Sequence, residues 1–222
     1  MNVDVTDAIL ISLRAALFGT LLATPVALGL GHLLARRTFP GRSLLAAALF
    51  VPLVLPPVVT GYLLLALFGR GGPLGFLDVP FHFAACVVAA FFVSLPLFVL
   101  SARQAFEAVD PRYEEVAATL GSPRAATFRR VTLPLALPGL AAGATLAFAR
   151  ALGEFGATVV LAGNLEGETR TLSLAVYALL ETPDGDDAAR TLVLASLVLS
   201  TLSVVLYEVF RRRARLRLEL PG

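Results

Sequence analysis

Residues 83–102, FAACVVAAFFVSLPLFVLSA, form a run of twenty residues without one charged side chain. A helix needs about 20 mainly apolar residues to cross the hydrocarbon core of a bilayer. The rest of the chain agrees, since 57% of its 222 residues are hydrophobic and only 15% are charged. A soluble domain carries about 25% charged residues. The sequence therefore predicts a membrane protein and excludes an ordinary water-soluble globule.

Four further apolar segments flank this run, at about 9–35, 44–68, 131–153 and 191–210. We therefore predict an all-α polytopic membrane protein with five transmembrane helices, in which residues 1–222 form a single transmembrane domain. The segment 44–68 is unusual because it holds Pro52, Pro56 and Pro57, which interrupt the helical hydrogen-bond ladder. Two interpretations of these prolines stay open, a simple kink and a bent helix that lines a translocation path.

The arginines predict the orientation of the chain in the membrane. Three lie in 36–43, five in 103–130 and five in 211–217, and five transmembrane helices place all three stretches on one side. The other side receives three arginines, namely Arg70, Arg170 and Arg190. Loops on the cytoplasmic side carry the excess of basic residues. The prediction is an N-terminus outside and a C-terminus inside a multi-pass chain of the cell membrane.

The composition excludes several classes of chemistry. All 18 basic residues are arginine, so the chain has no lysine for a phosphate-binding P-loop or for a Schiff base. One cysteine and two histidines exclude a multi-cysteine metal site and leave little for a zinc site. A net charge of only +2 gives no sign of nucleic-acid binding. We expect this chain to bind neither a metal nor a cofactor and to have no catalytic residue.

The stretch between the third and fourth apolar segments carries the signals of two short helices joined by a sharp bend. Asp110 is a favourable N-cap and Pro111 a favourable first helical residue. Gly121 can end this helix in the left-handed conformation, and Ser122 with Pro123 repeats the start signal for a second helix. Because this bent element lies on the basic side, the sequence predicts a docking site for a soluble partner.

The same stretch resembles a family signature. The order EVA at 115–117, Gly121, and VTLP at 131–134 resembles the Glu-Ala-Ala loop of ABC importer permeases, with matching spacing and two mild departures, Val116 and Val131. In that family the loop, here 110–130, forms cytoplasmic coupling helices that sit in a cleft of the ATPase subunit. The resemblance implies that the coupling residues are Glu114, Glu115, Ala117, Ala118, Gly121, Leu133 and Pro134.

The resemblance also implies the partners of the chain. They are two copies of an ABC ATPase that binds ATP and magnesium, a second copy of this permease, an extracytoplasmic oxyanion-binding protein and the lipid bilayer. The chain itself would be a transport subunit without enzymatic activity, and it would not bind nucleic acid. ATP hydrolysis on another chain agrees with the lack of lysine here.

Longer motifs narrow the resemblance to the molybdate permeases. They are FPG at 39–41, PLVLPPVVTGYLL at 52–64, ARALGEFGAT at 149–158 and GETRT at 167–171. Sulfate and tungstate permeases are related to the same pattern, so molybdate import is favoured and tungstate or sulfate import stays an alternative. A stand-alone ion-coupled transporter and an intramembrane enzyme are less favoured, because the chain shows neither internal repeats nor a Ser-His or paired-carboxylate arrangement at membrane depth.

The sequence leaves the roles of two regions undecided. Residues expected along the translocation path or gate are Pro56, Pro57, Thr60, Arg150, Glu154 and Thr158. Arg150 and Glu154 are four residues apart and share a face if the fourth helix continues beyond Gly153, where they form either a structural ion pair or a gate. The segment 171–180 is too short to span the membrane and is either a re-entrant or an interfacial helix.

Overall fold

The computed structural model describes residues 5–182 and 185–219, and in this part of the chain every regular element is a helix. The elements, in chain order, are α1 (Val5–Arg36), α2 (Arg42–Val54), α3 (Pro57–Phe68), the 3-10 turn η1 (Gly75–Leu77), α4 (Phe83–Glu107), α5 (Pro111–Thr119), α6 (Arg124–Thr127), the π-helical turn η2 (Phe128–Thr132), α7 (Leu133–Leu152), α8 (Gly156–Leu161), α9 (Leu172–Leu180) and α10 (Asp186–Glu219).

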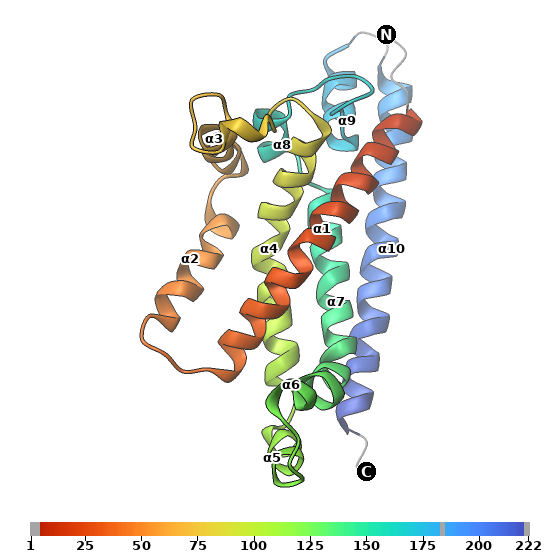
Figure 1. Ribbon diagram of the computed structural model, residues 1–222. Coiled ribbons are helices and arrows are strands. Elements are labelled where there is room, and N and C mark those ends of the chain that lie inside the picture. Colours follow the sequence, from red (N-terminus) through yellow and green to blue (C-terminus); the bar gives the residue numbers. More distant parts are fainter. Residues whose placement is uncertain (1–4, 183–184, 220–222) are drawn as a thin grey trace.

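Four long helices, α1, α4, α7 and α10, form the bundle shown in Figure 1. Each is long and apolar enough to cross a membrane, and together they confirm the predicted segments 9–35, 83–102, 131–153 and 191–210. The helices extend beyond those segments, because polar residues at a helix end can lie in the interfacial layer. The predicted segment 131–153 is extended most at its start, since α6, η2 and α7 form one continuous helix, Arg124–Leu152.

The predicted segment 44–68 is not one straight helix. Its two halves, α2 and α3, are bent by 112° at residues 55 and 56. Leu55 is extended because Pro56 follows it, and Pro57 begins the new helix at a position where no N–H group is needed. In Figure 1 the pair returns from the lower end of the bundle to the upper end, which adds a fifth span to the four long helices when the bent pair is taken as one span.

Small residues bring the helices close together. A Cβ atom placed on Gly19 of α1 would lie 2.7 Å from the Cβ of Ala90 in α4, and one on Gly31 would lie 2.8 Å from that of Ala102. In α7, Gly143 meets Ser101 of α4 at 2.7 Å in the same way. Lipid supplies little hydrophobic drive for helix association, so close backbone packing of this kind holds such bundles together.

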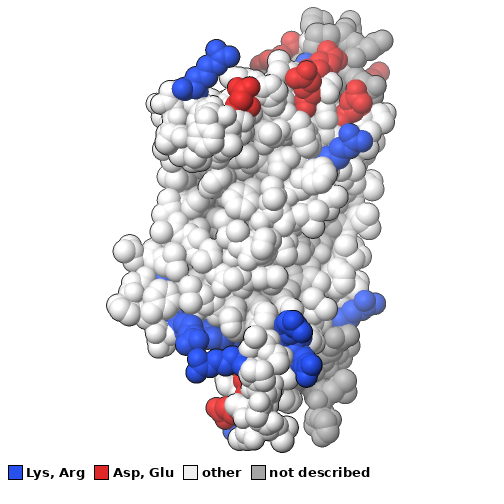
Figure 2. Space-filling model, viewed as in Figure 1, with Lys and Arg blue, Asp and Glu red and all other residues white. Residues whose placement is uncertain are grey.

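Charged side chains gather at the two ends of the molecule and leave an uncharged belt between them (Figure 2). Arginines predominate at the lower end, near α5 and α6, and acidic side chains at the upper end, near α9. Many leucines and valines of α1, α2, α3 and α10 are exposed within the belt, as expected for helices that face lipid. The charge pattern therefore places α5 and α6 on the cytoplasmic side.

Candidate functional site

The loop between α4 and α7 folds into a sharp elbow, formed by α5 and α6. The Asp110 carboxylate accepts a hydrogen bond of 2.9 Å from the backbone N–H of Arg112 and so caps α5. Gly121 ends α5 with a φ of +78°, a conformation that favours glycine. The backbone N–H of Ser122 then donates to the carbonyl of Ala117, which closes the turn before α6. The predicted two-helix geometry is confirmed.

Helix α5 projects from the lower end of the bundle into the surroundings (Figure 1). The structure describes all nine of its residues, and none of them is buried. Tyr113 and Val116 of α5 are large exposed hydrophobic residues. Leu120, which follows directly after α5, is 81% exposed. A short helix that leaves its apolar side chains in contact with water has the character of a docking surface.

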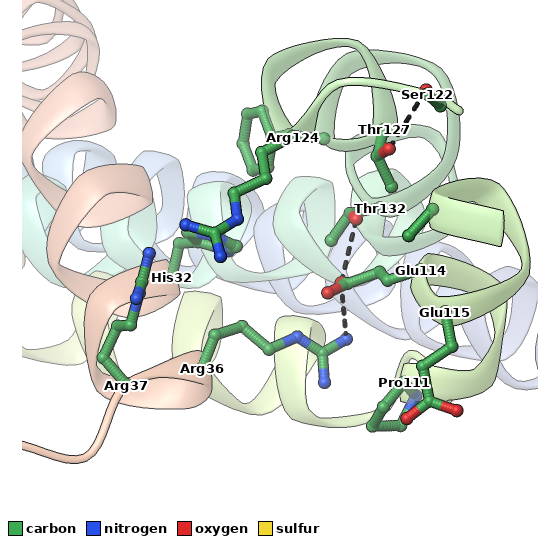
Figure 3. Close-up of a pocket in the computed structure, with 12 residues that line it drawn as sticks. His32, Arg36, Arg37, Pro111, Glu114, Glu115, Ser122, Arg124, Thr127 and Thr132 are labelled. Atoms are coloured by element: carbon green, nitrogen blue, oxygen red, sulfur yellow. Dashed lines mark hydrogen bonds and ion pairs between the residues drawn. The ribbon is translucent and has the colours of Figure 1, made fainter. Parts of the chain in front are cut away.

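The two glutamates of α5 point in different directions (Figure 3). The Oε1 atom of Glu114 lies 3.1 Å from Nη2 of Arg36 and accepts a hydrogen bond of 2.9 Å from the Thr132 hydroxyl. Glu115 is exposed, and no ion pair among the described residues involves it. Sequence alone does not distinguish the two glutamates, because the partners of Glu114 come from α1 and η2, which are distant in sequence. Arg36 counts in the sequence only as one of the basic residues that predict the orientation of the chain.

The remaining predicted coupling residues lie around the elbow. Ala118 is exposed on α5, whereas Ala117 is partly covered. Leu133 packs against the cluster around Phe106, and Pro134 is exposed in the first turn of α7. The assignment of these residues to coupling stays a prediction.

A cavity of about 440 Å³ opens between the elbow and the cytoplasmic end of α1 (Figure 3). It is lined by polar and charged side chains, which include His32, Arg36, Arg37, Glu114 and Arg124. The His32 ring also stacks edge-on against Phe106 of α4 and Phe128 of η2, with ring centroids 5.1 and 4.9 Å apart. The end of α1 thus contacts both α4 and the start of the continuous α6–η2–α7 helix.

The chain breaks between α2 and α3 and again between α7 and α8. The helices that follow these breaks, α3 and α8, pack against each other at the end of the molecule opposite the elbow (Figure 1). A Cβ atom on Gly156 would lie 2.6 Å from the Cβ of Pro57, and one on Gly61 would lie 2.9 Å from the Cα of Ala157. Of the predicted path residues, Thr60 and Thr158 are buried, whereas Pro56 and Pro57 are exposed. A role of these four residues in a translocation path stays a prediction.

The ion pair between Arg150 and Glu154 forms, but not on one helix. Helix α7 ends at Leu152, so the condition for a shared helix face, a continuation beyond Gly153, is not met. Glu154 lies in the break before α8, where its Oε2 is 2.9 Å from Nη1 of Arg150 and its Oε1 accepts a hydrogen bond of 2.7 Å from the Ala157 N–H. Only 3% of Glu154 is exposed. Its carboxylate therefore joins two helix ends, which supports the structural ion pair.

The segment 171–180 forms α9, which docks on the outer ends of α1 and α10. Leu172, Ala175 and Leu179 are buried against Ala8 and Leu192. The Ser12 hydroxyl of α1 also accepts a hydrogen bond of 2.7 Å from the Leu172 N–H. The helix thus packs on the bundle at the end opposite the elbow.

The described part of the chain contains no group of three histidine, cysteine, aspartate or glutamate side chains that could hold a metal ion. The site is thus built from an exposed cytoplasmic elbow and a bundle with broken helices.

Residues 24–216 match the model of a protein family described as the binding-protein-dependent transport system inner membrane component. The chain belongs to this family. It is therefore a multi-pass membrane protein of the inner membrane and a transport permease subunit, and such permeases associate with an ATPase and a binding protein.

Individual relatives agree with the family. The chain is 44% identical to the molybdenum transport system permease protein ModB of Escherichia coli (strain K12), over 95% of each sequence. It is 34% identical to the sulfate transport system permease protein CysT of Salmonella typhimurium, over 100% of this chain and 81% of that one. Among solved structures, an inward-facing MetNI methionine ABC transporter matches with a TM-score of 0.66 at 17% identity, over 96% of this chain and 94% of the other. At that identity the match shows the fold alone.

Proposed function

We propose that the chain is the transmembrane subunit of an ATP-driven importer that moves molybdate into the cytoplasm. The observation that carries this proposal is the exposed α5–α6 elbow, which presents the Glu-Ala-Ala-type sequence on the basic side of the membrane. The choice of molybdate rests on relatives named for molybdenum transport, which are more similar to this chain than the sulfate permease is.

The proposed partners are those that the resemblance of the elbow to the Glu-Ala-Ala loop implies. One ATPase subunit docks on each elbow, so two ATPases require two copies of this permease. ATP and magnesium bind to the ATPases, because this chain lacks the lysine that a P-loop uses. An extracytoplasmic binding protein delivers the oxyanion to the opposite end of the homodimer. This chain itself carries out no hydrolysis and holds no cofactor.

The continuous helix Arg124–Leu152 gives the elbow a mechanical connection to the membrane. When ATP draws the two ATPases together, α5 and α6 move with them, and α6 continues directly through η2 into α7. The π-helical turn η2 lies at the junction, where such turns commonly mark a functional site. Tilting of α7 would open the bundle alternately to the two sides, as in other alternating-access transporters.

Metal content of cells tests this function directly. The gene is deleted, cells grow in trace molybdate with excess sulfate, and molybdenum and tungsten are measured by mass spectrometry. We expect cellular molybdenum to fall, and the wild-type gene but not the Gly121→Asp variant to restore it. Unchanged molybdenum with lost tungsten or sulfate uptake would replace molybdate by one of the two alternative substrates. Normal uptake of all three oxyanions would contradict the proposed function.

A further inference from the structure

Helix α5 packs loosely on the bundle, and the side chain of Glu114 provides its polar contacts to other helices. None of its nine described residues is buried, and its backbone packs mainly against the neighbouring α6 and η2. An ion pair joins α5 to α1: the side chain of Glu114 reaches Arg36, the last residue of α1. A movement of α5 can thus be passed to α1 through this carboxylate.

Arg36 is held in place for this contact. Its Nη2 atom lies 3.1 Å from Glu114 and also donates a hydrogen bond of 2.8 Å to the backbone carbonyl of Val109, a buried residue just before α5. Only 14% of the Arg36 side chain and 30% of the Glu114 side chain are exposed. A guanidinium group offers several donors in one plane, so it can hold a carboxylate and a carbonyl at the same time.

Glu114 in turn connects Arg36 to the fourth transmembrane helix. Its Oε1 atom, which faces Arg36, also accepts the hydrogen bond from the Thr132 hydroxyl. Thr132 is buried in η2, at the start of α7. One carboxylate oxygen therefore links the end of α1 to α5 and to the base of α7 (Figure 3).

The end of α1 is well placed to pass movement on. One turn before Arg36, His32 packs between Phe106 and Phe128, and Gly31 lies in close contact with Ala102 of α4. Helices α1 and α4 also touch farther along, where Gly19 near the middle of α1 meets Ala90 of α4. They can therefore move together as a rigid pair when the end of α1 is displaced.

We propose that Arg36 is a positioning residue that couples the docking helix α5 to the α1–α4 pair through Glu114 and Thr132. This inference rests on the proposed function, because it assumes that an ATPase moves α5. Two routes then leave the elbow: one through η2 into α7, and one through Arg36 into α1 and α4. Loss of the second route should leave the ATPase bound and active, but fewer ions should be transported for each ATP that is hydrolysed.

The test measures oxyanion uptake and ATP hydrolysis in the same vesicles, with the complete complex and its binding protein. For Arg36→Gln and for Glu114→Gln we expect the number of ions carried per ATP to fall about tenfold, as for loss of an allosteric coupling. Arg37→Gln is the matched control, because Arg37 is adjacent and exposed and no ion pair among the described residues involves it. Its ratio should stay at the wild-type value. Exchange of the two charges, Arg36→Glu with Glu114→Arg, should recover part of the lost ratio.

A merely structural role would change the amount of complex, whereas the ratio does not depend on that amount. If Arg36→Gln does not assemble, Glu114→Gln decides, because it lies on a helix without buried residues. An unchanged ratio in Glu114→Gln, or an equal loss in Arg37→Gln, would overturn the inference and leave the importer proposal intact. Wild-type vesicles in which ATP drives no uptake of molybdate, tungstate or sulfate would overturn the importer proposal and the inference with it.

Discussion

The α5–α6 elbow and the α3–α8 contact lie at opposite ends of the molecule and differ in how they are held (Figure 1). In the elbow no residue of α5 is buried, and Gly121 has open space around it. In the α3–α8 contact, Gly61 and Gly156 let backbones approach so closely that an added methyl group would collide with the neighbouring helix. In the proposed function a partner completes the elbow, whereas the α3–α8 contact is completed within the chain. Substitutions at the two places should therefore fail for different reasons.

The largest effect is expected for Gly121→Asp. No atom beyond the two chain neighbours lies within 4 Å of a Cβ placed on Gly121, so we expect the new side chain to act mainly by blocking a docked partner. The left-handed backbone adds strain of about 1–2 kcal/mol for a residue with a side chain, and less for aspartate. We expect transport to be abolished while the chain stays in the membrane, as measured by oxyanion uptake and immunoblotting.

Gly41→Asp is the matched control for this substitution. Gly41 has a φ of +87° and equally open surroundings, and it precedes α2. The backbone strain is therefore the same, but the position lies outside the elbow. Gly41→Asp should retain transport; a similar loss in both variants would attribute the effect to strain and contradict docking at Gly121.

Glu115→Arg should also abolish transport. Glu115 is exposed at the rim of the cavity and does not share the contacts of Glu114 with Arg36 and Thr132, so we expect a reversed charge to act mainly on a partner that binds it (Figure 3). Like charges brought together at an interface cost several kcal/mol. Copurification of the ATPase with the tagged permease measures the effect, and Glu115→Gln should bind more ATPase than Glu115→Arg. Wild-type amounts of bound ATPase in Glu115→Arg would show that this residue lies outside the interface.

A smaller effect, on stability, is expected for Gly156→Ala in the α3–α8 contact. The new Cβ atom would lie 2.6 Å from that of Pro57 and 3.1 Å from backbone atoms, so the two helices must separate. Overpacking of this kind costs about 1–3 kcal/mol, which lowers the melting temperature of a chain of this size by between about 2 and 10 °C. Thermal unfolding in detergent measures the shift.

Gly29→Ala serves as the comparison, because no atom lies within 4 Å of a Cβ at Gly29, which is an interior residue of α1. Alanine is a better helix former than glycine by about 1 kcal/mol, so this variant should melt at or above the wild-type temperature. Equal melting temperatures for Gly156→Ala and Gly29→Ala would show that α3 and α8 are not in close contact.

The smallest effect is expected for Glu154→Gln. The substitution removes the ion pair with Arg150 but leaves an oxygen that can accept the hydrogen bond from Ala157. We expect a loss of about 1 kcal/mol in stability, since Arg150 is partly exposed and water can solvate it. The KM for oxyanion uptake should stay unchanged. A changed KM at an unchanged melting temperature would instead support a gate at this ion pair.

The sequence predicts the elements of this protein better than it predicts their contacts. Apolar length alone located the four long helices, and Asp110 and Gly121 fixed the ends of α5, because each of these signals is local. Prolines at 56 and 57 indicate a break in the helical ladder, but they do not predict the 112° angle or the close contact of α3 with α8.

Contacts between distant segments left no such signal. Arg36 and Glu114 are 78 positions apart, and both types of residue are common on an exposed cytoplasmic surface. The four-residue spacing of Arg150 and Glu154 would put both on one helix face only if the helix continued beyond Gly153. The break at Gly153 instead frees Glu154 to accept a hydrogen bond from the first turn of α8.

Protection of a single thiol tests the docking of an ATPase on the elbow most directly. The native Cys86 is buried, so Leu120→Cys provides one reactive thiol at the tip of the elbow. Its labelling rate with a polar maleimide is compared in membranes with and without the ATPase, and Phe76→Cys, at the opposite end, is the control. We expect the ATPase to slow labelling at residue 120 about tenfold or more and to leave residue 76 unchanged. Equal labelling of Leu120→Cys in both membranes would contradict the docking of an ATPase on α5.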